Sequence, residues 1–241
     1  MKLGRLDEES TANVGIIGSG QVAQIVGGKL LDLGHTVTLS SRDTSQGKDR
    51  GEWGKLPSAD EWVAAQRAEG ADAAAGSFAQ AAAAGELVIN ATAGGGSLAA
   101  LEAAGASNLR GKILIDLANP LDFSQGMPPS LSVCNTDSLG EQVQAALPET
   151  RVVKTLNTVG ANVMIDPNQL GEPTTMFIAG NDAEAKAWVT RHVLREWLGW
   201  EHVLDLGDIT QARGTEMYMP IWLRMWAATG ASALNIKLVT A

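Results

Sequence analysis

The 241-residue sequence predicts an α/β fold, a doubly wound and mainly parallel sheet with a C-terminal helical extension. Three observations predict it. Short apolar or β-branched segments alternate with segments of helical spacing, the pattern of parallel strands joined by crossover helices. A glycine-rich turn joins the first strand to the first helix. The tail lacks the alternation, so we expect residues 1–206 to form the sheet domain and residues 207–241 a helical segment.

Strands are expected wherever a short apolar or β-branched run is bounded by turn residues. These runs lie at residues 13–17, 36–40, 71–75, 87–91, 112–117, 151–156, 174–179 and 201–206. After the second run, the polar stretch 43–57 contains Trp53 and shows no periodicity, so we expect a loop there.

Helices are expected between the strands, where capping residues precede segments of helical spacing. The first, residues 20–33, stops at Gly34. Serine followed three residues later by glutamate predicts a capping box at Ser58 with Glu61, and again at Ser138 with Glu141. The other expected helices follow Ser77, run from Ser97 to near Gly105, and run from Asn181 with Glu184 to Leu198.

The tail differs from the rest of the chain. Over residues 210–229, large apolar side chains occur nearly all round a helix: Met217, Met219, Ile221, Trp222, Leu223, Met225 and Trp226. A helix without a polar face is buried on most sides. The sequence leaves three places open for it: a core of its own, a position under a cofactor, or a subunit interface.

Composition excludes several classes of function. The formal net charge of −9 argues against a nucleic-acid partner or an anionic membrane, because both need basic patches. One cysteine cannot form an internal disulfide or a zinc site. No apolar run approaches the ~20 residues of a membrane span, and the first nine residues lack an apolar signal core. We therefore expect a cytoplasmic protein.

A phosphate-binding turn is predicted at the start of the first helix. Gly18, Ser19, Gly20, Gln21, Val22 and Ala23 have the form G-x-G-x-x-A, inside a βαβ core of about residues 13–156. The first glycine permits a tight turn, the second leaves room for a pyrophosphate, and the alanine lets helix and strand pack closely. The N–H groups and the dipole of the helix then favour the anion. The turn predicts a dinucleotide site of Rossmann type.

The end of the second strand favours NADP(H) over NAD(H). An NAD site has a carboxylate there, ~20 residues past the glycines, which binds the ribose hydroxyls. This chain has instead Ser40, Ser41 and Arg42, which would bind the 2′-phosphate that a carboxylate repels. Lys48 is close enough in sequence to contribute. Asp43 is the exception, and we expect its side chain to point away or to cap the loop.

The chain lacks the motifs of hydrolytic and metal chemistry. It has no His-Glu-x-x-His helix and no Gly-x-Ser-x-Gly elbow, and its three histidines are scattered at 35, 192 and 202. We therefore expect no metal site and no catalytic side chain. Lys154, in a strand, is a proton donor or a structural residue. Hydride transfer between two bound cofactors suits this inventory, because it mainly needs proximity and orientation.

Small or polar residues follow three successive strands, in the stretches 90–96, 118–121 and 156–160. Each stretch alone would serve as a plain turn. Because ligands of open α/β sheets bind beyond the carboxyl ends of the strands, the three together predict a cleft.

The chain resembles a known family, the coenzyme F420-dependent NADP reductases. These proteins are related to the nucleotide-binding domain of membrane ferric reductases. The matching segments are the turn 18–23, residues 40–42, 116–120 and 153–158, Arg213, Glu216, Pro220 and the ending 234–239. The likeness covers nearly the whole chain. It implies hydride exchange between NADPH and a deazaflavin or flavin, and it implies a homodimer.

The resemblance also assigns residues by position. The glycine turn and residues 40–42 would hold NADP, small residues after one strand would flank the nicotinamide, and the stretch after another would face the second cofactor. The flanking residues are Ala91, Thr92 and Ala93, and those facing the second cofactor are Asn157, Thr158 and Val159. Asn119 and Pro120 are further candidates for cofactor binding. The tail helix would close the site. Deazaflavin-using members carry histidine where this chain has Asn157, so the acceptor stays open among F420, a flavin, and a small carbonyl or imine.

Two other hypotheses remain. An imine or carbonyl reductase of the pyrroline-carboxylate reductase type would need a proton donor beside the nicotinamide, and the candidates are Lys154 and Tyr218. A non-catalytic NADP sensor would bind NADPH tightly and turn over no acceptor.

Overall fold

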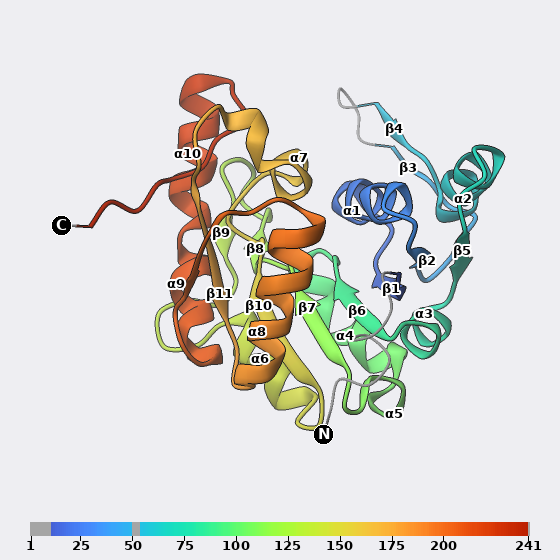
Figure 1. The fold of residues 1–241 in the computed structure, drawn as a ribbon. Helices are drawn as coiled ribbons and strands as arrows, with labels where there is room; N and C mark the ends of the chain where they lie inside the picture. Colours follow the sequence, from blue (N-terminus) through green and yellow to red (C-terminus); the bar gives the residue numbers. More distant parts are fainter. Residues whose placement is uncertain (1–10, 50–53, 241) are drawn as a thin grey trace.

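A computed structural model describes residues 11–49 and 54–240 (Figure 1). Its centre is an eight-stranded sheet of order β12-β11-β10-β7-β6-β1-β2-β5. The strands are β1 Asn13–Ile17, β2 Thr36–Ser40, β5 Ala73–Gly76, β6 Leu87–Asn90, β7 Ile113–Asp116, β10 Arg151–Thr155, β11 Thr175–Ala179 and β12 His202–Asp205. Every neighbouring pair is parallel except β10 with β11. The predicted α/β fold with a mainly parallel sheet is confirmed.

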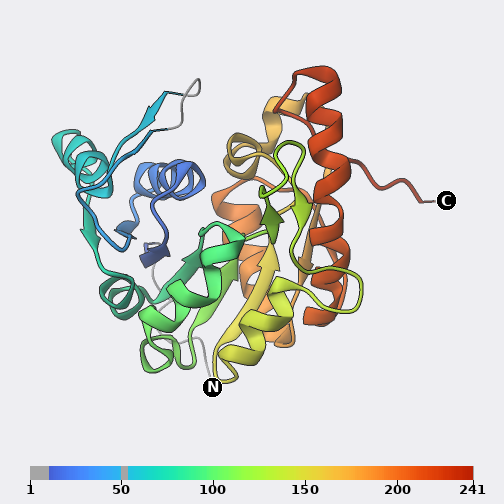
Figure 2. The ribbon, with the colours of Figure 1, turned by 180° about the vertical axis from the view of Figure 1, so that it is seen from behind.

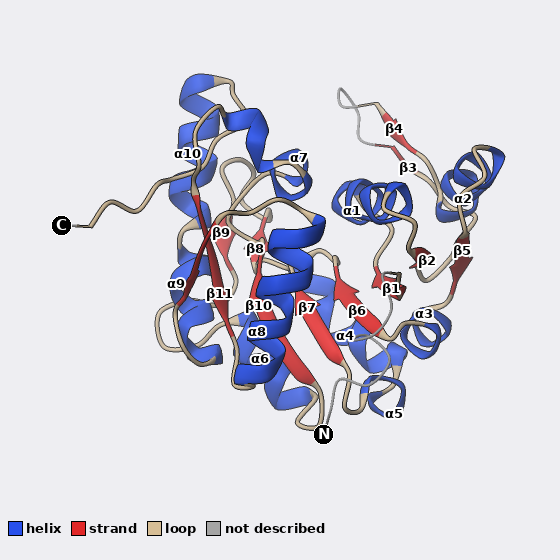
Figure 3. Cartoon of the chain, in the orientation of Figure 1, coloured by secondary structure: helices blue, strands red, loops and turns tan. Residues whose placement is uncertain are grey.

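Helices cover both faces of the sheet (Figures 2 and 3). One face carries α1 Gln21–Asp32, α2 Ala59–Ala68, α7 Ala161–Ile165, α8 Ala183–Trp188 and the π-helix η4 Val189–Trp197. The other carries α3 Phe78–Ala84, α4 Gly94–Ala104, α5 Ala106–Leu109 and α6 Leu139–Ala146. Adjacent strand residues enter opposite cores, as Ile16 and Ile17 do, because side chains alternate along a strand. Strands buried on both faces explain the continuous apolar runs of the sequence.

The tail forms two helices where the sequence predicts one. A 3₁₀ turn, η5 Ile209–Gln211, leads into α9 Ala212–Met217, and α10 Met219–Thr229 follows. Met219, Trp222 and Leu223 form a small core with the partly buried Leu121, Tyr218, Trp226 and Leu234. Ile221 is 50% exposed and Met217 is 38% exposed. The single chain therefore buries one side of the tail helices, and both their place beyond it and the boundary at residue 207 stay predictions.

The capping predictions have mixed outcomes. Ser58 with Glu61 forms the predicted capping box, and Ser77 caps α3 in a second one with Gln80. Ser138 caps α6, although the Glu141 carboxylate binds Arg213 and the Ser138 hydroxyl, not the Ser138 backbone N–H.

Two predicted helix starts are wrong. The helix assigned to Ser97 begins earlier, at Gly94, with Ala93 at the N-cap, and Ser97 lies inside it. Asp182, not Asn181, caps α8.

The predicted loop 43–57 contains a hairpin, β3 Lys48–Asp49 with β4 Lys55–Leu56. Trp53 lies outside the described residues. A second hairpin pairs β8 Leu121–Asp122 with β9 Ser130–Leu131, and a 3₁₀ turn, η3 Pro167–Leu170, follows α7; the sequence indicated neither. Strands of two residues are too short to show a periodicity. Within the described ranges, no helix has the length and apolarity needed to cross a bilayer.

Candidate functional site

The predicted site residues come together at one edge of the sheet. The chain runs from β1 through β2 to β5 on one side, and then from β6 through β7 to β10 on the other. The topological switch point therefore lies between β1 and β6, where open α/β sheets bind their ligands. Because these strands are parallel, their carboxyl ends present 18–20, 41–42, 91–93, 118–120 and 157–159 along the same edge. Lys48 lies in β3, which belongs to a separate two-stranded sheet, and its contribution to the site stays a prediction.

The turn after β1 has the conformation that a phosphate cradle needs. Gly18 has a φ of +120°, and a Cβ there would lie 2.8 Å from the Ala91 carbonyl oxygen. Its N–H donates to the Ser40 carbonyl over 3.1 Å, so one glycine joins the ends of three strands. A Cβ on Gly20 would meet no atom within 4 Å, so the space above it is open.

The first turn of α1 offers its backbone donors to that space. Gly20 is the N-cap, no side chain caps the helix, and no acidic residue lies in its first turn. The N–H groups at this end therefore suit an anion. Gln24, which the sequence did not single out, steadies the turn by donating to the Ser19 carbonyl over 3.1 Å and to the Pro57 carbonyl over 2.9 Å.

The end of β2 carries two serines in different roles. The Ser40 hydroxyl is fully buried and donates to the Ile16 carbonyl over 2.7 Å, so its proton is engaged within the sheet. The Ser41 hydroxyl is buried and has no partner among the residues that the structure describes. Arg42 is exposed, and among the described residues it has no hydrogen-bond or ion-pair partner.

Asp43 caps its own turn, as the sequence suggested. Its carboxylate accepts from the Ser45 N–H over 3.0 Å and from the Ser45 hydroxyl over 2.7 Å. These bonds lower the pKa of Asp43. The carboxylate is therefore occupied with its own turn, although its charge stays close to Arg42 in sequence.

The ends of β6 and β7 touch. A Cβ on Gly94 would lie 2.0 Å from the Asn119 carbonyl oxygen, so only glycine fits there. Asn90 donates to the Ser97 hydroxyl over 2.6 Å and to the Asp116 carboxylate over 2.8 Å, and it accepts from the Thr92 hydroxyl over 2.8 Å. Ala91 is buried, Ala93 is exposed and Pro120 is buried, so this stretch has little side chain to obstruct a flat ligand.

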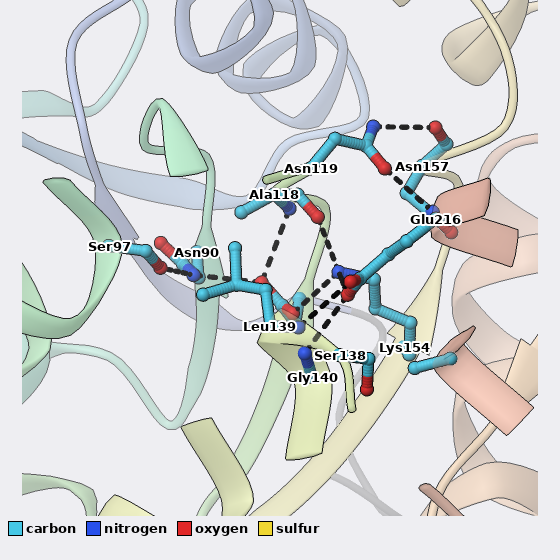
Figure 4. A network of polar contacts seen from close by, with 12 residues as sticks. Asn90, Ser97, Ala118, Asn119, Ser138, Leu139, Gly140, Lys154, Asn157 and Glu216 are labelled. Carbon is cyan, nitrogen blue, oxygen red and sulfur yellow. Dashed lines mark hydrogen bonds and ion pairs between the residues drawn. The ribbon is translucent and has the colours of Figure 1, made fainter. Parts of the chain in front are cut away.

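Below this edge lies a buried ionic network (Figure 4). The Lys154 ammonium lies 2.8 Å from carboxylate oxygens of both Asp116 and Glu216, and it donates to the Ala118 carbonyl. Glu216 also accepts from the N–H groups of Leu139 and Gly140 at the start of α6, over 2.8 and 2.9 Å. The lysine and both carboxylates are at most 1% exposed. The network ties α9 to β7, β10 and α6.

The network bears on the two roles predicted for Lys154. Burial pushes the pKa of Lys154 down, but the two carboxylates outweigh burial and raise it. The ammonium therefore keeps its proton near neutral pH, and its donors are engaged. These contacts favour the structural role for Lys154, and the hypothesis of a proton donor at this position stays a prediction.

The end of β10 is held by a pair of asparagines. Leu156 has a φ of +62°, a rare conformation for a non-glycine residue that persists only where its surroundings impose it. The Asn119 amide nitrogen donates to the Asn157 backbone carbonyl over 2.8 Å, and the Asn157 amide nitrogen donates to the Asn119 side-chain oxygen over 2.9 Å. The remaining oxygen of Asn157 and the Thr158 hydroxyl are buried without partners. Val159 packs into the core instead of the edge.

The chain is similar to proteins of one known family over most of its length. The family model "NADP oxidoreductase coenzyme F420-dependent" matches residues 13–120. A crystal structure of a candidate F420-dependent NADP-reductase from Arthrobacter sp. FB24 is 46% identical, with a TM-score of 0.86, over 95% of this chain and 100% of that one. The chain belongs to the F420-dependent NADP oxidoreductase family. It is therefore an oxidoreductase of an NADP-binding family.

More distant structures share the fold with this family member. The imine reductase BcSIRED from Bacillus cereus BAG3X2 is 19% identical, with a TM-score of 0.57, over 90% of this chain and 61% of that one. A reductive aminase from Aspergillus terreus, in complex with NADPH and ethyl levulinate, is 16% identical, with a TM-score of 0.54, over 92% and 68%. No curated protein matches the chain.

The three histidines lie away from the predicted site residues. His35 is buried, which lowers its pKa; it accepts from the Ala12 N–H over 3.0 Å and packs on Trp197. His192 contacts Glu196 on the surface over 2.7 Å, and His202 is exposed in β12. No group of His, Cys, Asp or Glu within the described ranges has the arrangement of a metal site. A cavity of about 110 Å³ beside Trp200 is lined by none of the predicted site residues.

Proposed function

We propose that this oxidoreductase transfers a hydride between NADP(H) and a deazaflavin such as F420, or a flavin. The bound nicotinamide would supply or receive the hydride, and the balancing proton would exchange with solvent. The chain's residues would bind and orient the two rings, because orientation is the main requirement of this chemistry. The proposal carries no catalytic side chain, and it includes a cytoplasmic homodimer.

The fit of NADP is supported by the ends of β1 and β2. The open space above Gly20 and the uncapped N-terminus of α1 suit a pyrophosphate. The observation that carries the proposal is the pair beyond β2: a buried, unpartnered Ser41 hydroxyl beside Arg42, with no carboxylate at the strand end itself. A buried hydroxyl without a partner is costly, and a ligand phosphate would satisfy it.

The remaining assignments follow from position. Ala91, Thr92 and Ala93 would flank the nicotinamide from β6, and Asn119 and Pro120 from β7. The stretch 157–159 at the end of β10 would lie on the acceptor side. The exposed Met217 and Ile221 on α9 and α10 support a subunit interface there.

The test of the 2′-phosphate site is Arg42→Ala, measured as Kd for NADPH and for NADH by fluorescence titration. A charge-assisted hydrogen bond is worth about 1.5–3 kcal/mol, so NADPH affinity should fall roughly 10- to 100-fold. NADH affinity should change less than about twofold, because it lacks the phosphate. Arg110→Ala is the control, since Arg110 is an exposed partner of Glu149. Equal losses for NADPH and NADH would exclude Arg42 from the phosphate.

The acceptor is tested by following the nicotinamide absorbance during incubation of NADPH with F420, FMN or a cyclic imine. Turnover with F420 or FMN supports the proposal. Turnover with the imine alone would favour the second hypothesis, for which the buried and unpartnered Tyr218 hydroxyl would be the proton donor. Tight NADPH binding without any turnover would indicate a sensor.

A further inference from the structure

Three buried polar atoms without a partner in the described part of the chain lie on segments that meet beside the proposed acceptor position. They are the side-chain oxygen of Asn157 and the hydroxyls of Thr158 and Tyr218. Asn157 and Thr158 follow β10, while Tyr218 joins α9 to α10 and packs against the same small core as Leu121, which follows Pro120. A Cβ on Gly160 would lie 3.0 Å from the Ser232 carbonyl and 3.5 Å from the Trp222 ring, so the end of β10 also borders the tail. Folded proteins rarely leave such atoms unpaired.

The asparagine pair fixes what Asn157 can accept. The Asn157 backbone carbonyl can only accept, so the Asn119 amide nitrogen must face it. That orientation turns the Asn119 oxygen toward the Asn157 amide nitrogen. Exchanging oxygen and nitrogen in either side chain would bring two acceptors or two donors together. The Asn157 side-chain oxygen is therefore a fixed acceptor that still needs an N–H donor.

The other two atoms are hydroxyls, which can donate. Burial raises the pKa of Tyr218, so its hydroxyl is protonated at neutral pH. The Thr158 hydroxyl always carries its proton. The three groups therefore offer one acceptor and two donors from adjoining segments.

We propose that Asn157, Thr158 and Tyr218 recognise the imide edge, C(=O)–N(H)–C(=O), of the hydride acceptor. The ring N–H donates to Asn157, and the two flanking carbonyls accept from the hydroxyls. Asn119 is the positioning residue, because it orients the Asn157 amide. The inference rests on the proposed function. Deazaflavins and flavins share this edge, a cyclic imine lacks it, and the nicotinamide carboxamide offers only one carbonyl beside its N–H.

The experiment measures kcat/KM for NADPH oxidation with lumiflavin and 3-methyllumiflavin, and with the corresponding 5-deazaflavin pair. Methylation removes only the N–H. In the unmodified protein it should lower kcat/KM about tenfold or more, because a buried acceptor stays unpaired. In Asn157→Leu and Asn119→Leu, each pair should react equally within about twofold. Asn162→Leu, on the exposed part of α7, should keep the full discrimination.

Tyr218→Phe keeps the ring and removes the hydroxyl, so it serves where a larger change impairs folding. It should lower kcat/KM roughly threefold or more for both members of a pair. Two results with the unmodified protein overturn the inference: equal kcat/KM for methylated and unmethylated acceptors, or no turnover of either pair although NADPH binds. A third result also overturns it: Asn157→Leu changes only the ratio of kcat/KM between NADPH and its 3-acetylpyridine analogue and leaves the discrimination between the acceptors intact. If the unmodified protein does not bind NADPH, the proposed function itself is refuted.

Discussion

The edge where the strands end has two halves, one at β1 and β2 and the other at β7 and β10. They offer different kinds of group to a ligand. At the turn from β1 to α1, the backbone provides the groups: the conformation of Gly18, the open space at Gly20 and the N–H groups of α1. The end of β2 adds the side chains of Ser41 and Arg42. Around β7 and β10, side chains provide them, through the Lys154 network and the asparagine pair. The first half suits a phosphate, which any set of N–H donors binds. The second half has fixed donors and acceptors, which suits discrimination between rings.

The first half of the edge therefore suits binding of the phosphate, and the second half suits selection of the acceptor ring. A backbone cradle costs little to form, because the glycines need no partner side chain. The side-chain half depends on a buried lysine that compensates two carboxylates, and such groups are expensive to bury unless they are paired. The buried charges of Lys154, Asp116 and Glu216 thus lie next to the half of the edge that we assign to the acceptor.

The largest expected effect comes from a substitution in the second half, in the Lys154 network. Lys154→Met leaves Asp116 and Glu216 buried without a cation, and breaking a buried pair costs about 3–5 kcal/mol. The free energy of unfolding in urea measures the loss. Arg110→Met is the matched control, because its partner Glu149 is exposed and such pairs contribute ~1 kcal/mol or less. Similar losses for the two variants would mean that the network contributes little.

The pH dependence of the same variant sharpens the test. The pKa of Lys154 lies above its ordinary value of 10.5 in the folded protein. A raised pKa gives stability that is fully present below the ordinary value and disappears as the pH rises through the folded value. The Lys154→Met penalty should therefore be the same at about pH 7 and pH 9. A penalty that shrinks between these two values would contradict a charged lysine.

The next largest effect is expected from a substitution in the first half that weakens NADPH binding and leaves the protein folded. Gly20→Val places methyl groups in space that holds no protein atom, at a φ of −72° that valine adopts. Stability should change by less than about 1 kcal/mol, while NADPH affinity should fall about a hundredfold. Gly28→Val in the same helix, also with open space at its Cβ, should leave binding unchanged. Unaltered NADPH binding by Gly20→Val would place the pyrophosphate elsewhere.

The same contrast explains how much could be predicted from the sequence. The limits of β1 and β2 were predicted to the residue, because each is a short apolar run next to glycine or a turn. The glycine turn was predicted because local chain geometry defines it. The helix after β6 was placed too late, since Ser97 matches a cap by type but its hydroxyl pairs with Asn90 in the folded chain.

The second half could not be predicted in this way. Lys154 and Asp116 are 38 residues apart, and no local pattern shows that they meet. The resemblance drew attention to Glu216 without its role, Asn90 was noted only as part of the stretch 90–96, and Gln24 gave no signal. Whether a hydroxyl has a partner also depends on the whole fold, so Ser40 and Ser41 looked alike in sequence although one is paired and the other is not.

That last difference gives the smallest prediction. Ser41→Ala removes a hydroxyl that no protein group uses, so stability should be unchanged or slightly higher. If the hydroxyl binds the 2′-phosphate, NADPH affinity should fall about fivefold, or ~1 kcal/mol, and NADH affinity should stay constant. Ser40→Ala should do the reverse, because its hydroxyl donates to Ile16: it lowers stability and leaves the ratio of the two affinities intact. A loss shared equally by NADPH and NADH in Ser41→Ala would place the hydroxyl on the ribose or the pyrophosphate, leaving Arg42 as the only selective group after β2.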